Sequence, residues 1–238
     1  MIHFLKLKRT KQIRKKTGKA ATRALYVEKN YRMGKVTMEK TIAVSKPILV
    51  CGKHSSGKTR WLKRLCSNAN EIWAKQKDSP LFFNSTGSIN EWKDQEPIKE
   101  WWNSNNSEKK WEKLSGHKKE RVIVEYVSSV WTTVFVDNID RLSGKKLEVM
   151  KNIIESSKSK MWVASSTAEN RISPSLREMV LRASPQQFLL NSPVSYDATN
   201  IFVMICCMIL IMMGHIEIAV MVGFFRVLSR GMFATKQQ

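Results

Sequence analysis

The chain has 238 residues, a formal net charge of +21 and four cysteines. This length suits one α/β domain with accessory segments, and the excess of positive charge indicates a polyanionic partner, either nucleic acid or an acidic membrane face. The cysteines lack the spacing of a zinc site or of a disulfide framework, which excludes a small disulfide-stapled fold and favours a reducing compartment.

The first 46 residues carry a disproportionate share of this charge. They contain fourteen Lys or Arg residues against two acids, and eight of these bases fall between Lys6 and Lys19. Residues 6–19 are therefore expected to form a basic arm that binds a polyanion, or else a solvated tail without a specific partner. Residues 23–44 alternate apolar and polar side chains around Asn30 and Gly34, which predicts a short hairpin.

Several short apolar runs follow, separated by polar stretches with helical periodicity. Such runs are typical of strands buried on both faces of a parallel sheet, and their alternation with helices predicts a doubly wound, mostly parallel five-stranded α/β domain over residues 47–192. The predicted strands are Pro47–Cys51, Pro80–Asn84, Thr133–Asp137, Met161–Ser165 and Gln187–Leu190. The predicted helices are Trp61–Trp73, Lys145–Ser156 and Ser173–Arg182.

Residues 87–119 form an insertion in this domain whose polar stretches contain four tryptophans, Trp92, Trp101, Trp102 and Trp111. The spacing of the first three suits one face of a helix, so packing against the sheet is favoured over stacking on unpaired bases. Just beyond the insertion, Val122–Val127 fits either a further strand or part of a helix.

Residues 52–59 match the pattern G-x-x-x-x-G-K-[ST] and lie between a predicted strand and a predicted helix. They read Gly52, Lys53, His54, Ser55, Ser56, Gly57, Lys58 and Thr59. The glycines allow a tight turn whose N–H groups point at a phosphate, and the following helix presents its positive dipole end to the same anion. We expect Lys58 to contact the β- and γ-phosphates of a nucleotide, and Thr59 to hold Mg²⁺.

A second motif lies on the third predicted strand. The run Val134–Asp137 ends in a carboxylate and is followed by Asn138 and Asp140. Because Mg²⁺ prefers carboxylate and hydroxyl oxygens, Asp137 is the predicted Walker B residue, which orients the metal. Thr59 and Asp137 together make the predicted metal site, and ATP with Mg²⁺ are the predicted cofactors.

On these residues the chain resembles the additional-strand branch of P-loop NTPases, which includes AAA+ and FtsK/HerA-like enzymes, over roughly residues 45–192. The resemblance implies that the phosphate-loop strand is flanked by the strand Met161–Ser165. It also implies that a polar residue ending that strand, Ser166 or Thr167, senses the γ-phosphate. Related enzymes place an arginine finger after this strand, and the candidates here are Arg171, Arg177 and Arg182.

Two features depart from this family. Many members follow the Walker B aspartate with a glutamate that positions water, whereas this chain has Asn138, which cannot accept a proton. Either Asp140 substitutes, or another residue polarises the water, or hydrolysis is slow and the protein is mainly a nucleotide-dependent switch. The second departure is that no helical lid is predicted after residue 192.

Residues 199–225 are predicted to form a hydrophobic membrane segment, followed by a basic tail over residues 226–238. The uninterrupted apolar run Ile201–Met213 is too short to span a bilayer alone, but the whole segment is long enough. Glu217, near its middle, would be protonated, paired or functional. A hairpin that bends at Gly214 and a buried core helix are the alternatives.

The sequence favours a membrane-associated, Mg²⁺-dependent ATPase that acts on or beside nucleic acid. Its NTPase domain would face the cytosol, and other copies of the chain are among its expected partners. It is similar in outline to small ATPases of viruses and mobile elements, including genome-packaging ATPases and the Zot-like ATPases of filamentous phages. One alternative, favoured by Asn138, is a nucleotide-gated membrane scaffold with little hydrolysis. The other is a basic lipid-binding protein with a vestigial nucleotide site.

Overall fold

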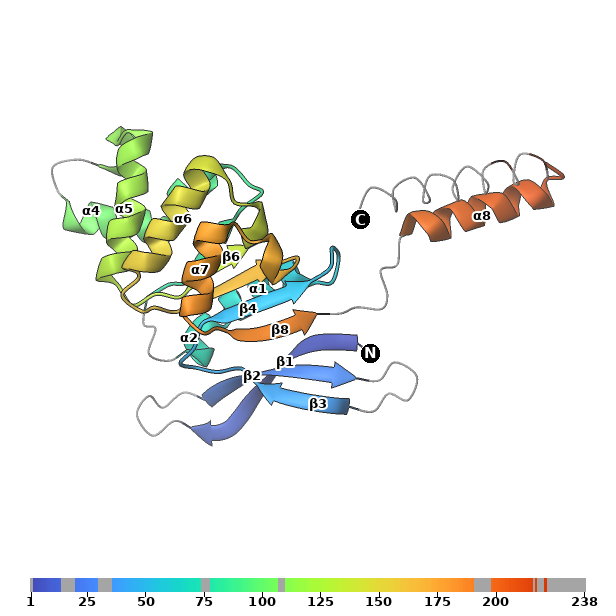
Figure 1. Cartoon of the computed structure of the whole chain (residues 1–238), viewed down its shortest axis with the longest axis horizontal. Coiled ribbons are helices and arrows are strands. Elements are labelled where there is room, and N and C mark those ends of the chain that lie inside the picture. Colours follow the sequence, from blue (N-terminus) through green and yellow to red (C-terminus); the bar gives the residue numbers. More distant parts are fainter. Residues whose placement is uncertain are drawn as a thin grey trace. The chain divides into compact units, whose positions relative to one another are not determined.

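The computed structural model describes residues 2–13, 20–29, 36–73, 78–106, 110–190, 198–215, 217 and 221. The chain divides into two units, residues 1–193 and residues 194–238. The larger unit contains a five-stranded sheet with helices on both faces and a separate three-stranded sheet (Figure 1). The smaller unit contains helix α8 (Ala198–Met212).

The five-stranded sheet is parallel and has the strand order β5-β6-β7-β4-β8. Its strands are β4 (Ile48–Gly52), β5 (Leu81–Asn84), β6 (Val134–Asp137), β7 (Trp162–Ser166) and β8 (Gln186–Leu190). Every residue of the central strands β6 and β7 is buried, as the apolar runs predicted. The predicted strands are confirmed, and β4 lies beside β7 as the resemblance implied.

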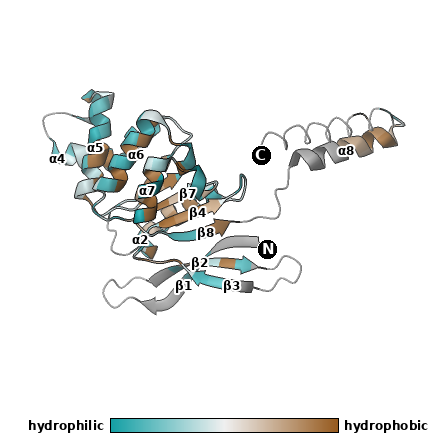
Figure 2. Cartoon of the chain, viewed as in Figure 1, coloured by the Kyte–Doolittle hydropathy of each residue, from teal (hydrophilic) through white to brown (hydrophobic). Residues whose placement is uncertain are grey.

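Helices cover both faces of this sheet. The helices α1 (Lys58–Ser67) and α2 (Ala69–Ile72) share one apolar core with the sheet. The opposite core contains α3 (Ile89–Lys93), α4 (Glu96–Asn105), α5 (Gly116–Ser129), α6 (Gly144–Ser156) and α7 (Pro174–Arg182). Three short 3₁₀ turns complete the connections, η1 (Trp111–Lys113), η2 (Ile139–Arg141) and η3 (Glu169–Arg171). In Figure 2 the helices α4–α7 combine hydrophilic and hydrophobic stretches, whereas the strands β4 and β7 are hydrophobic.

Two local predictions are refined by the structure. Val122–Val127 lies within α5, so the helix alternative is confirmed. The predicted helix Trp61–Trp73 begins earlier, at Lys58, and is interrupted at Asn68, where α1 ends and α2 begins. The Asn68 side-chain amide donates to the Arg64 carbonyl at 2.8 Å, which satisfies a carbonyl in the last turn of α1.

The tryptophans of the insertion pack against the sheet. Trp92, Trp102 and Trp111 are buried in the core beneath α3–α7, and Trp101 packs against it from the side. The Trp92 indole N–H donates to the Asn84 carbonyl at the end of β5, at 2.9 Å. The packing prediction is therefore confirmed, because buried rings are unavailable for stacking on bases.

A buried carboxylate joins three helices of this layer. The Glu120 side chain of α5 is 5% exposed, and its oxygens lie 2.9 Å from Lys93 Nζ of α3 and 2.7 Å from Lys145 Nζ of α6. His117 Nδ1 lies 3.5 Å from the same carboxylate. Burial raises the pKa of Glu120, but hydrogen bonds from Lys145 and Lys93 outweigh burial, so this pKa lies below its ordinary value.

The N-terminal sheet is antiparallel and has the order β1-β2-β3, with β1 (Ile2–Ile13), β2 (Ala20–Lys29) and β3 (Val36–Thr41). Its β2–β3 pair confirms the predicted hairpin, whose turn at residues 30–35 lies outside the described residues. The predicted basic arm over residues 6–19 stays a prediction as a binding element, and its residues 6–9 and 13 lie in a strand that pairs with β2. Residues 14–19 lie outside the described residues.

Side chains attach the N-terminal sheet to β8, which is next to the phosphate-loop strand. The Tyr26 hydroxyl donates to the Leu189 carbonyl at 2.8 Å, and its ring lies 5.1 Å from that of Phe188. The Gln186 side chain accepts from the Ala43 N–H at 2.6 Å and donates to the Thr41 carbonyl at 3.1 Å. Burial raises the pKa of Tyr26 to about 12, so its hydroxyl remains a donor at neutral pH.

Helix α8 contains much of the predicted hydrophobic segment and ends at Met212. Gly214 has φ 81°, its N–H donates to the Ile211 carbonyl, and the His215 N–H donates to the Leu210 carbonyl at 2.9 Å. These two bonds form a Schellman motif. Within the described part of the chain, no helix combines the length and apolar character that a bilayer crossing requires. The predicted basic tail, residues 226–238, lies outside the described residues.

Candidate nucleotide-binding site

The phosphate loop begins where β4 ends and has the backbone that its glycines predict. A Cβ on Gly52 would collide with the Leu190 carbonyl oxygen and come within 2.7 Å of Ser56 Oγ, so only glycine fits between β4 and β8. Gly57 has φ 86° and lies at the N-terminus of α1. Ser55 also adopts a left-handed conformation, with φ 61°. The loop therefore turns tightly into the helix whose N-terminus faces it.

Lys58 lies inside this loop. Its side chain is buried, and its ammonium donates to the Gly52 carbonyl at 2.6 Å and to the Lys53 carbonyl at 2.8 Å. Burial lowers the pKa of Lys58, while the carboxylates of Asp140 and Asp137 act in the opposite direction and favour the charged form. The loop thus holds a cation whose desolvation is only partly compensated by its protein neighbours.

The two predicted metal ligands are in contact. Thr59 Oγ1 donates to Asp137 Oδ2 at 2.7 Å, although 78 residues separate them in sequence. The other oxygen of Asp137 accepts from the Ser165 hydroxyl of β7 at 2.5 Å. Both carboxylate oxygens are therefore oriented, one by the loop and one by the neighbouring strand.

Asn138 has a backbone role that the sequence did not indicate. It has φ 55° and ψ 52°, a left-handed conformation that Asn tolerates better than Glu, and it begins the 3₁₀ turn η2. Its backbone N–H donates to Ser165 Oγ at 2.8 Å. Its side chain makes no hydrogen bond with the residues that the structure describes. The residue after the predicted Walker B aspartate therefore begins a turn here.

Asp140 lies on η2 and interacts electrostatically with the loop. Its charge is the largest of the influences that raise the pKa of Lys58, ahead of that of Asp137. Asp140 Oδ1 is buried and has no hydrogen-bond partner among the described residues. Such an orphaned acceptor beside a buried cation marks a place for a further donor. Asp140 thus acts on Lys58 through its charge, and no hydrogen bond joins the two within the described residues.

The candidate sensors lie at the end of β7, beside the loop. The Thr167 carbonyl accepts from the Gly52 N–H at 3.3 Å, and the half-buried Thr167 side chain remains a candidate. The Ser166 hydroxyl is buried and donates to the Ala168 carbonyl at 2.7 Å, so it serves the local turn. Ser165, which sequence reasoning missed, is the serine of this strand that contacts Asp137.

The three candidate arginines differ in their partners. Arg177 lies 3.3 Å from Glu169, and Arg182 lies 2.8 Å from Glu178. Arg171, which ends the exposed turn η3 after the sensor strand, forms no ion pair within the described chain. An arginine finger remains a prediction, and Arg171 is the candidate whose charge is available for it.

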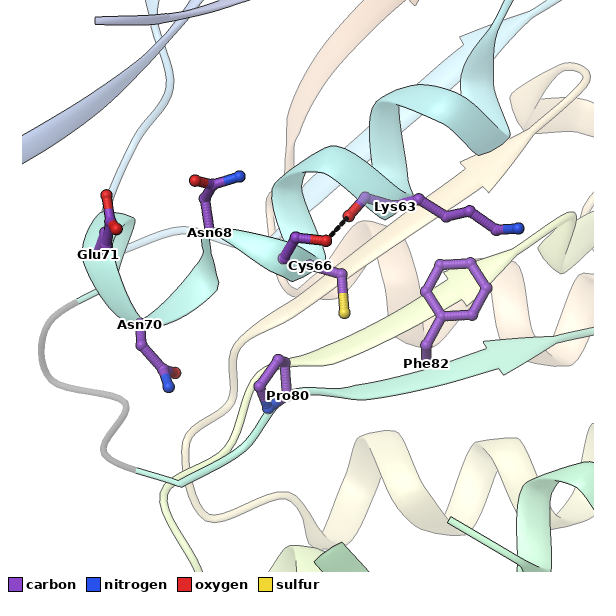
Figure 3. Close-up of a pocket in the computed structure, with 8 residues that line it drawn as sticks. Lys63, Cys66, Asn68, Asn70, Glu71, Pro80 and Phe82 are labelled. Atoms are coloured by element: carbon purple, nitrogen blue, oxygen red, sulfur yellow. Dashed lines mark hydrogen bonds between the residues drawn. The ribbon is translucent and has the colours of Figure 1, made fainter. Parts of the chain in front are cut away.

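Two hollows of the larger unit lie away from this loop. The first, of about 550 Å³, lies between the end of α1, α2 and β5. In Figure 3 the Cys66 and Phe82 side chains project into the space between α1 and β5. Burial raises the pKa of Cys66 to about 11, so its thiol remains protonated near neutral pH and is a poor nucleophile. The second hollow lies at the N-terminal ends of the strands, away from the loop at their C-terminal ends.

A nucleoside triphosphate with Mg²⁺ fits the donor set of the loop. The Lys58 ammonium supplies a cation for phosphate oxygens, and the hydroxyl of Thr59 and the carboxylate of Asp137 supply hard oxygens for Mg²⁺. Ser56 Oγ, like Asp140 Oδ1, is buried without a partner in the described residues. A hydrated metal–phosphate complex would carry both donors and acceptors of the kind that these groups lack.

No protein-family model and no curated protein matches this sequence. Similar solved structures include Thermomonospora curvata EccC (ATPases 2 and 3) with a signal sequence peptide, at 14% identity and a TM-score of 0.41, over 74% of this chain and 37% of that one. The Thermotoga maritima RuvB Holliday junction branch migration motor is 15% identical with a TM-score of 0.33, over 61% and 37%.

A putative ABC transporter ATP-binding protein from Pyrococcus furiosus is 18% identical with a TM-score of 0.36, over 69% of this chain and 94% of that one. The chain spans less than two fifths of the EccC and RuvB structures. Its parallel sheet of order β5-β6-β7-β4-β8, with the loop after β4, fits a P-loop NTPase core.

Proposed function

We propose that this protein is a Mg²⁺-dependent ATPase that acts on or beside nucleic acid in association with a membrane. One observation carries the nucleotide part of the proposal. Thr59 of the phosphate loop and Asp137 of the Walker B strand share a 2.7 Å hydrogen bond beside the Lys58 ammonium. Hydroxyl, carboxylate and ammonium in this arrangement are the groups that Mg²⁺ and phosphates require.

Each side chain has a task in this proposal. Lys58 neutralises phosphate oxygens, and Thr59 and Asp137 hold the metal. Bound Mg²⁺ supplies Lewis-acid polarisation of the phosphoryl oxygens. Ser165 keeps the Asp137 carboxylate oriented through its 2.5 Å hydrogen bond. Asp140 orients the attacking water, since one of its oxygens is buried without a partner in the described chain.

Charge on the N-terminal sheet supports the nucleic-acid part. Lys6, Lys8 and Arg23 are exposed, and Lys8 of β1 lies directly opposite Arg23 of β2. Like charges opposite each other destabilise an antiparallel pair, and a phosphate backbone between them would remove that repulsion. Apolar side chains of α8 support the membrane part, because Met208, Ile209 and Met212 are exposed.

The test is ATP turnover by the full chain in detergent, with and without DNA, together with flotation on anionic vesicles. Turnover that requires Mg²⁺ and rises with DNA supports an ATPase that acts on nucleic acid. DNA stimulation should weaken as salt rises, because phosphate contacts release counterions. Turnover that ignores DNA at low salt contradicts the nucleic-acid part, and a chain that stays unfloated contradicts the membrane part.

A nucleotide-gated membrane scaffold is the second candidate. Asn138 favours this candidate, because the residue after the predicted Walker B aspartate is not acidic and instead adopts the left-handed backbone conformation that begins η2. This candidate predicts tight binding of MgATP, assembly on binding, and turnover near zero. Sedimentation with ATP and with a non-hydrolysable analogue separates the two candidates, since a scaffold assembles equally with both.

Asp140→Asn is expected to lower turnover about a hundredfold with little change in MgATP affinity, because the carboxylate orients and deprotonates water. The matched variant is Asn138→Asp, which places a carboxylate two residues earlier on a backbone that Asp also tolerates. We expect this variant to change turnover less than Asp140→Asn does. A large rise in turnover with Asn138→Asp would show that the missing group belongs at that position and not at Asp140.

A further inference from the structure

A hollow of about 590 Å³ lies at the N-terminal ends of the parallel strands, whereas the phosphate loop lies at their C-terminal ends. Two of its lining residues immediately precede strands, Pro47 before β4 and Met161 before β7, whereas the loop follows β4. Trp73, Trp131 and Lys160 also line it. Its volume lies within the range of sites that bind small molecules or single nucleotides.

Trp131 is the exception among the tryptophans of this chain. The chain has eight, and the other seven are buried or half-buried, whereas Trp131 is 45% exposed. An exposed large aromatic ring is informative, since packing normally removes such surface from water. Here the ring lies at the rim of a hollow.

The ring is presented on a fixed backbone with a lysine ammonium over one of its faces. The Trp131 backbone N–H donates to the Asp78 carboxylate at 2.8 Å, and the Trp131 carbonyl accepts from the Asp78 backbone N–H at 3.3 Å. Lys158 Nζ lies 5.9 Å from the Trp131 ring centroid and donates to the Ser129 carbonyl at 2.9 Å. The platform is therefore preformed.

Backbone strain also gathers at this hollow. Four described residues other than glycine have positive φ, and two of them, Ser55 and Asn138, belong to the nucleotide site. The other two are Lys160, which lines the hollow, and Ser184, which follows the lining residue Ala183. Such conformations are strained for residues other than glycine and concentrate at functional sites. The hollow thus shares a feature with the site already described.

We propose that this hollow binds an unpaired base of single-stranded nucleic acid. The base stacks on the face of the Trp131 ring that Lys158 does not cover, and the flanking phosphates contact Lys158 and Lys160. The inference rests on the nucleic-acid part of the proposed function and names where the strand is held. Aromatic rings beside lysines are the platform that such strands use, because every base has a π-face and every linkage a charge.

Charge favours a nucleic acid over a protein partner at this place. Lys160 lines the hollow, Lys46 and Lys158 adjoin lining residues in sequence, and all three are exposed. The carboxylate of Asp78, by contrast, accepts a hydrogen bond from the Trp131 backbone. The Trp73 indole N–H is buried and has no hydrogen-bond partner among the described residues. A base carbonyl within the hollow would give this donor an acceptor.

The experiment measures binding of a fluorescein-labelled oligothymidine to the full chain by anisotropy, with quenching of indole emission as a second readout. Trp131→Leu keeps an apolar side chain but loses the π-face, and should weaken binding about tenfold. Trp131→Phe keeps a ring and should stay within about threefold. The matched control is Leu189→Ala, which removes an exposed apolar side chain at the far end of β8.

The outcomes separate this inference from the function on which it rests. Equal binding by Trp131→Leu and the wild type would overturn the inference and leave nucleic-acid action standing. A wild type that binds no oligonucleotide would overturn both. Free thymidine monophosphate that competes as well as the strand would show a mononucleotide site instead. Turnover without DNA should be unchanged in Trp131→Leu, since the hollow lies at the opposite ends of the strands from the loop.

Discussion

Lys58→Ala is expected to lower ATP turnover about a thousandfold, since it removes the cation that stabilises charge on the transferring phosphate. The ammonium is buried and lies 2.6 Å from the Gly52 carbonyl, so no exposed lysine can replace it. Stabilisation by MgATP should fall with turnover, because the same cation contacts the phosphates before the reaction. The measurements are steady-state turnover and the shift in Tm with MgATP.

The matched control for this change is Lys63→Ala, which removes an exposed lysine on the next turn of α1. Burial lowers the pKa of Lys58 in the folded state. This burial cost is therefore present at neutral pH and fades as pH rises from the lowered folded pKa toward the unfolded value near 10.4. Lys58→Met removes this cost and should not lower Tm at pH 7. Turnover retained in Lys58→Ala would contradict a phosphate role for this residue.

Glu120→Ala is expected to reduce the free energy of unfolding by about 3–5 kcal/mol, because it leaves buried Lys93 without its counter-charge. The carboxylate also contacts Lys145 of α6, so its loss loosens three helices at once. Urea unfolding of the wild type and the variant measures the difference. Glu125→Ala is the matched control, since Glu125 is exposed on the same helix and its loss should change stability by less than about 0.5 kcal/mol.

The pH dependence of this difference follows from the pKa of Glu120, which is lowered in the folded state. A carboxylate with a lowered pKa contributes stability above its unfolded pKa of about 4.3 and loses it as pH falls through the folded pKa. The gap between wild type and Glu120→Ala should therefore be full at pH 7 and shrink below about pH 4. A gap that is constant down to pH 3 would show a packing effect instead.

The α/β core could be predicted from sequence because its signals are local. Each buried strand is a short apolar run, and the phosphate loop lies directly between one such run and a helix. Asp137 was identifiable because a carboxylate ends a run of apolar residues, where a buried strand meets the edge of the sheet. These features depend on neighbours in sequence, so no tertiary information was needed.

Other features depend on pairing, which the sequence does not display. The run Leu5–Lys8 alternates apolar and basic residues with the period of a strand. The density of positive charge around it favoured a basic arm, and only its pairing with β2 identifies it as a strand. Ser165 was missed because its contact with Asp137 depends on the alignment of β6 with β7. The left-handed Asn138 was missed because the composition of η2 does not reveal its backbone conformation.

Hydrogen bonds join β8 to the N-terminal part of the chain, from Tyr26 to the Leu189 carbonyl and between the Gln186 side chain and Ala43 and Thr41. They fix how a ligand of the N-terminal sheet would be related to the phosphate loop. A basic tail on a flexible tether explores distances that grow as about 5–6 Å times the square root of its length. A sheet that is hydrogen-bonded to β8, the strand beside β4, has almost no such range of distances. A ligand bound to the N-terminal sheet would stay at a nearly constant distance from the loop. A force on that ligand would be transmitted directly to β8.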